Sequence, residues 1–126
     1  MTENEKSKCH LIIHSAAAAS GAGNIVPIPG LGAGADMAAI TTMAISLASV
    51  FGRELTSAAA RGAAYAALKR AILKQPAKYL AKEFVKIIPF LGQAVAAGIS
   101  VALAEAAGWQ LAYEFDSDRQ WHQTMA

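Results

Sequence analysis

Residues 37–52, MAAITTMAISLASVFG, carry the pattern on which the predicted fold rests. The stretch has no charged residue and is rich in alanine, the strongest helix former. Asp36 precedes it, at a place where a carboxylate can cap the free amide groups of a first turn. Gly52 closes it, since glycine readily adopts the left-handed conformation that ends many helices. We therefore expect a helix between Asp36 and Gly52.

A segment dense in proline and glycine lies before this helix. Residues 25–36 read IVPIPGLGAGAD, a composition that opposes a continuous helix and favours a structured turn. Residues 6–22 precede it and combine an apolar group with an alanine run, which favours another helix. The sequence thus predicts a first helical hairpin whose marked turn positions are Pro27, Pro29, Gly30, Gly32 and Asp36, with Gly52 at its end.

Three further helices are expected after Gly52: over 53–75, over 76–88 and from 93 to about 115. The sequence Pro-Gly-Leu-Gly at 29–32 recurs as Pro-Phe-Leu-Gly at 89–92, so that Pro89 and Gly92 mark a second turn. This echo favours two related αα-hairpins, and because the match is short, chance is the alternative.

Composition supports an all-α single domain of four to five helices with close, alanine-rich packing. Alanine supplies 30 of the 126 residues, and only 16% of the chain is charged. These figures exclude a disulfide scaffold, a collagen-like repeat and a polar disordered chain, and they disfavour a β-rich fold. The single domain spans residues 1–126 and has four segments. They are a first hairpin (1–52), a basic amphipathic segment (53–86), a long apolar helix (87–115) and a polar tail that is expected to fray (116–126).

Small residues recur every four positions on two of the expected helices. One row is Ala94, Gly98, Ala102 and Ala106, and the other is Ala59, Ala63, Ala67 and Ala71. Such rows let helix backbones approach closely, in a membrane or in a tight soluble bundle. We expect the first row to be a helix-packing face, and the pattern does not decide between lipid and water as its surroundings.

Basic residues also recur every four positions. The row comprises Arg70, Lys74, Lys78, Lys82 and Lys86, and the region 53–86 holds eight basic and two acidic residues. A basic amphipathic helix can lie on an anionic membrane, where its lysines reach the headgroups. A solvated outer face is the alternative. Nucleic acid is not expected as a partner because no recognition motif accompanies the lysines.

No segment is a clean transmembrane span, which needs about 20 apolar residues. Residues 15–35 and 87–104 are uncharged but are interrupted by prolines, and residues 37–52 are short. Each fits a re-entrant hairpin, a tilted short span or a buried core helix. The first ten residues mix acids with lysines, so we predict no signal peptide.

Side chains that could carry chemistry are few. Cys9 is the single cysteine, and His10 and His14 stand one helical turn apart without further ligands, so no metal ion is expected. The glycine-rich run at 30–34 lacks the lysine of a phosphate-binding loop. The acids near the end have no evident partners: Glu105, Glu114, Asp116 and Asp118. We therefore predict neither an enzyme nor a bound cofactor, although Asp36 would be a functional candidate if it lay inside a membrane.

Several of these features occur together in one known family. Residues 27–29 (Pro-Ile-Pro), the glycine-rich spacer, Asp36, the pair at 51–52 (Phe-Gly) and the run KIIPFLG at 86–92 resemble an uncharacterised helical domain. That domain is appended to bacterial Era-like GTPases and occurs in YcjF-type inner-membrane proteins. The resemblance covers residues 10–115 and places Pro27, Pro29, Asp36 and Gly52 at the family's marked positions, with Pro89 and Gly92 in its second turn.

The resemblance implies an α-helical, membrane-associated module that acts with a GTPase and has no enzymatic activity. Because this chain has no GTPase domain, any nucleotide dependence has to come from a separate partner or be absent. We expect a small bacterial module on the cytoplasmic side of the inner membrane that binds anionic lipid, forms homo-oligomers, and permeabilises or remodels membrane or serves a GTPase. The alternative is a soluble cytoplasmic adaptor that binds another protein through its alanine-rich faces.

Overall fold

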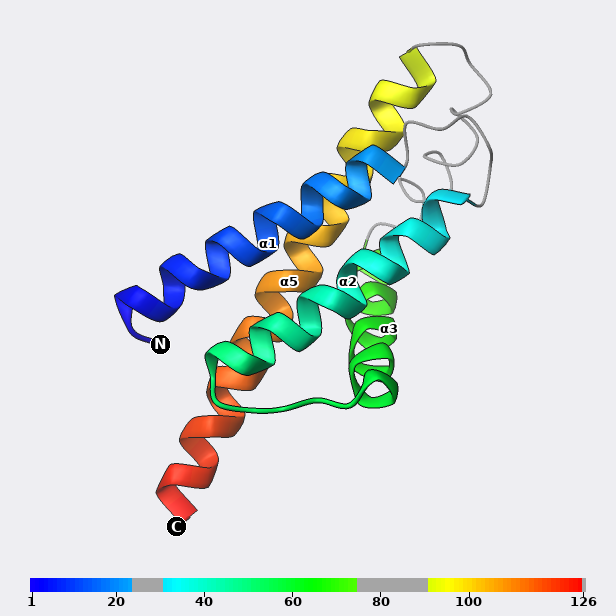
Figure 1. The fold of residues 1–126 in the computed structure, drawn as a ribbon. Helices are drawn as coiled ribbons and strands as arrows, with labels where there is room; N and C mark the ends of the chain where they lie inside the picture. The colour runs from blue at the N-terminus through cyan, green and yellow to red at the C-terminus, as the bar shows by residue number, and fades with distance from the viewer. Residues whose placement is uncertain (24–30, 75–90, 126) are drawn as a thin grey trace.

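The protein is all-helical. The computed structural model describes residues 1–23, 31–74 and 91–125, which form four α-helices and no strand (Figure 1). The helices are α1 (Glu3–Gly23), α2 (Leu31–Val50), α3 (Ser57–Lys74) and α5 (Leu91–Met125). The all-α prediction is confirmed.

The long helix α5 is the element around which the others pack. It contacts α1, α2 and α3, and α2 in turn contacts α1 and α3. Figure 1 shows α1, α2 and α5 running beside one another, with α3 on the other side of α2 from α1 and both chain ends at the same end of the bundle. The fold is therefore a small helical bundle in which α3 packs mainly against α2 and α5 and keeps a broad outer face.

Alanine and a few larger side chains fill the core. The large, fully buried apolar residues are Ile13, Ile40, Met43, Leu47 and Leu111. Gly108 of α5 lies against two of them, since a Cβ atom at this position would be 2.8 Å from both Ile13 Cγ1 and Met43 Sδ. The close approach of α5 to α1 and α2 thus requires a residue without a side chain at 108.

The end of α2 agrees with the sequence prediction. Gly52 has a φ of 76°, and its amide donates to the Ser49 carbonyl at 3.1 Å. The Arg53 amide donates to the Ala48 carbonyl at 2.9 Å. These two bonds form a Schellman motif, which satisfies carbonyl groups at the helix end and depends on the left-handed glycine.

The beginning of α2 differs from the prediction. The helix starts at Leu31, so Gly32 and Asp36 lie inside it, and Asp36 does not cap its first turn. Glycine costs a helix interior only about 1 kcal/mol, which the burial of a neighbouring face can offset. Gly92 is likewise inside a helix, as the second residue of α5. The other marked turn positions lie outside the described residues: Pro27, Pro29, Gly30 and Pro89.

The chain end also differs from the prediction. We expected residues 116–126 to fray, but α5 continues to Met125. Polar contacts between this last part of α5 and the start of α1 stabilise it. The third helix is shorter than predicted at its start, because it begins at Ser57 rather than at 53.

Candidate functional site

The outer face of α3 is basic and partly apolar. Arg61, Tyr65, Lys69 and Leu73 follow one another at intervals of four residues, and all four are exposed. Tyr65 is 60% exposed and Leu73 is 65% exposed, which is high for such large side chains. The opposite face of α3 is buried and consists of Ala60, Ala64, Ala67, Leu68 and Ala71. The helix therefore turns its alanines inward and its basic and large apolar side chains outward.

The outer face of α3 adds basic residues to the row that the sequence predicts, which begins at Arg70. Arg70 forms an ion pair with Glu114 of α5 at 2.7 Å, and Lys74 is exposed with no ion pair to a described residue. Arg61 and Lys69 are not part of the predicted row, because they lie one residue off the four-residue spacing that begins at Arg70. The remaining members of the predicted row lie outside the described residues: Lys78, Lys82 and Lys86.

The row that we predicted as a helix-packing face of α5 does not lie in the core of the bundle. Gly98, Ala102 and Ala106 are exposed, and the side chain of Ala94 lies outside the described part of the structure. The helix packs instead through the adjacent face, because that face carries the larger side chains that fill the core. Its buried residues include Leu103, Ala104, Ala107, Leu111 and Ala112.

The small-residue row on α3 shows a similar offset. Ala67 and Ala71 are buried, but Ala59 is exposed and Ala63 is only partly buried. Ala60 and Ala64 take their places in the core. A spacing of four residues drifts around a helix of 3.6 residues per turn, so it cannot keep one face buried over its whole length.

The exposed small residues of α5 form the floor of a groove between α3 and α5. Its volume is about 710 Å³, and its other lining residues include Ile99, Leu103 and Trp109. Lys74 lies at the groove and is the only charged residue among its described lining residues. Gln110 also lines it, and its buried side-chain oxygen Oε1 accepts no hydrogen bond in the described structure.

A second polar site lies inside the bundle. Asp36 is fully buried, and its carboxylate accepts hydrogen bonds from the hydroxyl groups of Ser20 and Ser100, the latter at 3.4 Å. The three residues come from α2, α1 and α5, so the site joins three helices. A buried carboxylate is costly unless donors surround it, and these hydroxyls supply them. The cluster links three helices through hydrogen bonds in the interior of the bundle, which is the work of a structural contact.

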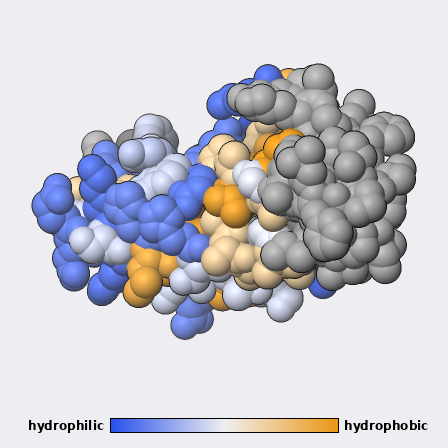
Figure 2. Space-filling view, turned by 90° about the horizontal axis from the view of Figure 1, so that it is seen from above, coloured by the Kyte–Doolittle hydropathy of each residue, from blue (hydrophilic) through white to orange (hydrophobic). Residues whose placement is uncertain are grey.

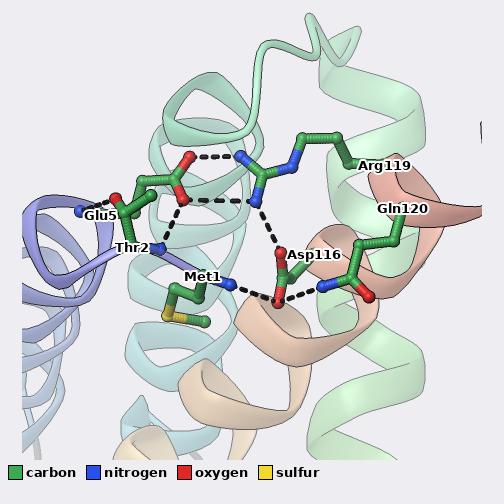
Figure 3. A network of polar contacts seen from close by, with 6 residues as sticks. All are labelled: Met1, Thr2, Glu5, Asp116, Arg119 and Gln120. Atoms are coloured by element: carbon green, nitrogen blue, oxygen red, sulfur yellow. Dashed lines mark hydrogen bonds and ion pairs between the residues drawn. The ribbon is translucent and has the colours of Figure 1, made fainter. Parts of the chain in front are cut away.

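A network of ion pairs joins the beginning of α1 to the end of α5. Arg119 bonds to both oxygens of Glu5 and donates to Asp116 at 2.7 Å. Asp116 also accepts from the Met1 amine at 3.1 Å and from Gln120 Nε2 at 3.2 Å. Figure 3 shows the two carboxylates on either side of the Arg119 guanidinium group. These contacts hold the last part of α5 in helical form.

The electrostatics of this network favour the charged forms. The hydrogen bond from Arg119 lowers the pKa of Glu5 from 4.5 to about 2, with help from the backbone amide of Thr2. The same bond to Glu5 raises the pKa of Arg119. Glu5 and Thr2 also form a capping box, with bonds of 2.9 and 3.1 Å, at the start of α1.

The acids near the chain end have partners, contrary to the sequence prediction. Glu105 contacts His14, Glu114 pairs with Arg70 at 2.7 Å, and Asp118 pairs with Arg53 at 3.0 Å. Asp116 belongs to the network of Figure 3. Apart from Arg119 and Gln120, each partner lies far away in the sequence, so helix periodicity alone could not reveal it.

The histidines and the cysteine at the start of the chain face different surroundings. Cys9 is buried in the core, and this burial raises the pKa of its thiol. His10 packs against the Trp109 ring at 4.7 Å between centroids, and His14 contacts Glu105. Within the described residues, no group of three potential metal ligands comes together.

Apolar surface is exposed mainly away from the chain ends. Figure 2 shows hydrophilic residues gathered at the end of the molecule with the two termini, and hydrophobic residues reaching the surface nearer its middle. Among the described helices, none combines the length and the apolar character that a bilayer crossing requires. The comparisons find no relative: no family model matches the chain, and no curated protein or solved structure matches it significantly.

Proposed function

We propose that this protein is a helical module that binds the surface of an anionic membrane through the outer face of α3. The observation that carries the proposal is the exposed row Arg61, Tyr65, Lys69 and Leu73 on a helix with four basic residues and no acidic one. Basic side chains can pair with lipid headgroups while an aromatic ring and a leucine enter the interface between them. The module would lie on the membrane, with α3 against the lipid and the other helices away from it.

The charges on α3 attract the protein to an anionic membrane surface. A basic residue near an anionic membrane surface contributes about 1 kcal/mol. Three of these basic residues form no ion pair with a described residue: Arg61, Lys69 and Lys74. The fourth, Arg70, forms an ion pair with Glu114. The basic residues Lys78, Lys82 and Lys86, which come after α3 in the sequence, would add to this attraction.

Sedimentation with vesicles tests the proposal. The protein should bind vesicles that contain phosphatidylglycerol, bind neutral phosphatidylcholine vesicles much less, and lose binding in high salt. The double variant Arg61→Glu and Lys69→Glu should bind at least about 30-fold more weakly, since it removes about 2 kcal/mol of attraction and adds two negative charges that the membrane repels.

A matched control separates a local effect from a change in net charge. The double variant Lys6→Glu and Lys8→Glu alters the charge equally, at exposed positions of α1. It should bind almost like the unaltered protein. Equal loss in both variants, or no binding of any anionic vesicle, would refute a role for α3 and favour the soluble adaptor.

Two further parts of the proposal concern events after the protein has bound the membrane. Self-assembly into a homo-oligomer would appear as an increase in mass on vesicles or in detergent, and permeabilisation as release of a trapped dye. The resemblance to the helical domain of Era-like GTPases adds a separate GTPase partner on the cytoplasmic side of the inner membrane. Co-sedimentation of such a GTPase with protein-coated vesicles, with and without nucleotide, would test that part.

A further inference from the structure

The groove between α3 and α5 has the size and lining of a small-molecule site. Its volume of about 710 Å³ falls within the roughly 300–1,000 Å³ of known ligand pockets. The groove is open where its lining residues have small side chains or none, at Gly98, Ala102 and Ala106. It is bordered by apolar side chains, among them Ile99 and Leu103. Such a lining suits an alkyl chain, because it offers extended apolar contact.

Two polar groups limit the ligands that suit this groove. Lys74 provides one positive charge, and it has no ion pair with a described residue. The Gln110 Oε1 atom is buried and lacks a hydrogen-bond donor in the described structure. A buried acceptor without a partner costs about 1–3 kcal/mol, so a ligand that supplies a donor gains from meeting it. The fitting ligand therefore combines an alkyl chain, an anionic group and a hydrogen-bond donor.

We propose that the groove binds a single-chain anionic amphiphile of the lysophosphatidate class. The alkyl chain lies over Gly98, Ala102 and Ala106, and the phosphate pairs with Lys74. The Gln110 side chain turns so that its Oε1 atom faces the groove and accepts a hydrogen bond from the glycerol hydroxyl. The negative phosphate complements the one charge among the described lining residues of the groove. The site differs from the outer face of α3, where Arg61 and Lys69 lie, so a bound amphiphile and membrane binding are separate properties.

The groove contains its own spectroscopic probe. Trp109 lines it, and the only other tryptophan, Trp121, is exposed on the last part of α5. The variant Trp121→Phe therefore reports on the groove alone. Measurements should be made in one fixed buffer, because His10 packs against the Trp109 ring and is part of its surroundings.

The binding experiment compares three compounds with matched alkyl chains, each below its micelle concentration. Myristoyl glycerol phosphate should change the Trp109 fluorescence with a saturable, one-to-one curve. Monomyristoylglycerol lacks the phosphate and should bind about tenfold more weakly or worse, since it loses the charged hydrogen bond to Lys74. Tetradecyl phosphate lacks the hydroxyl and should bind more weakly by a smaller factor. In Lys74→Gln, the charged and the neutral glycerol compounds should bind alike.

Gly98→Leu blocks the groove without disturbing the core. A Cβ atom at Gly98 would meet no atom within 4 Å, so the added side chain enters the groove. Gly62→Leu is the matched control, because Gly62 is an equally open glycine on the exposed side of α3. Gly98→Leu should keep the helical circular dichroism and lose amphiphile binding, and Gly62→Leu should keep both.

Three outcomes would overturn the proposal. The first is unchanged binding in Gly98→Leu, and the second is a fluorescence change that does not saturate. The third is a dimer of the free protein, seen by analytical ultracentrifugation, that Gly98→Leu dissociates while no amphiphile binds; a second copy of the chain would then occupy the groove. The Arg61→Glu and Lys69→Glu variant should retain amphiphile binding, so failure of membrane binding and failure of this proposal can be told apart.

Discussion

Two glycines of α5 show how differently the two sides of one helix are used. Gly108 faces the core, where a Cβ atom would approach Ile13 and Met43 to 2.8 Å. Gly98 faces the groove, where a Cβ atom would meet nothing within 4 Å. The first glycine is needed for packing between helices, and the second leaves space that no described part of the protein fills. A glycine in an alanine-rich helix can therefore serve a packed interface or an open one, and only its surroundings distinguish the two.

The largest expected effect is a loss of stability when Gly108, on the core-facing side of α5, is replaced. Gly108→Val should destabilise the protein by about 3 kcal/mol, because the added side chain forces Ile13 and Met43 out of their positions. Gly98→Ala should instead stabilise it by up to about 1 kcal/mol, since alanine is a better helix former. Urea unfolding followed by circular dichroism measures both. Equal effects of the two substitutions would contradict the difference between the two sides.

A smaller effect is expected at the buried carboxylate. Asp36→Ala should cost about 2 kcal/mol, because it removes an acceptor of the buried Ser20 and Ser100 hydroxyls. Asp36→Asn keeps one oxygen acceptor and should cost less. Thermal unfolding of both variants provides the measurement. If Asp36→Ala were as stable as the unaltered protein, the cluster would not join the three helices.

The sequence predicted the helical class and the end of α2 because both depend on local properties. Alanine content determines helix preference, and Gly52 alone meets the left-handed requirement at that end. The packing face of α5 could not be predicted in this way. Gly98 and Gly108 both occur among small residues, and which one is buried depends on the large side chains of α1 and α2, which are distant in sequence.

The polar partners show the same limit. Asp36 has the position of a helix cap in the sequence, yet it is buried, because α2 begins five residues earlier and brings it beside α1 and α5. Glu114 and Asp118 form ion pairs with arginines of other segments, Arg70 and Arg53 respectively. Only the assembled bundle brings these charges together. On the other hand, the exposed row on α3 could have been found by testing all four-residue spacings rather than the one that starts at Arg70.

The smallest predicted effect concerns the pH dependence of the network between the chain ends. Glu5 has a pKa of about 2 in the folded protein, compared with 4.5 for the ordinary group. A lowered pKa means that the folded state favours the charged form, so the contribution of Glu5 to stability is complete above about pH 4.5 and is lost as the pH falls towards 2. Glu5→Gln preserves the capping interaction with Thr2 but removes the charge. The difference in stability between this variant and the unaltered protein should therefore be constant near neutral pH and shrink below pH 4.5.

Urea unfolding at a series of pH values measures this difference, and Glu3→Gln is its control, since Glu3 is an exposed first-turn acid outside the network. Salt should reduce the effect only in part, because Arg119 also stacks over the Phe51 ring, 5.1 Å from its centroid, and this contact orients the guanidinium group. A difference between Glu5→Gln and the unaltered protein that persists unchanged to pH 2 would mean that the charge of Glu5 does not stabilise the end of α5. The helical form of that end would then rest on its other contacts, among them the hydrogen bonds of Asp116 and the packing of Phe115.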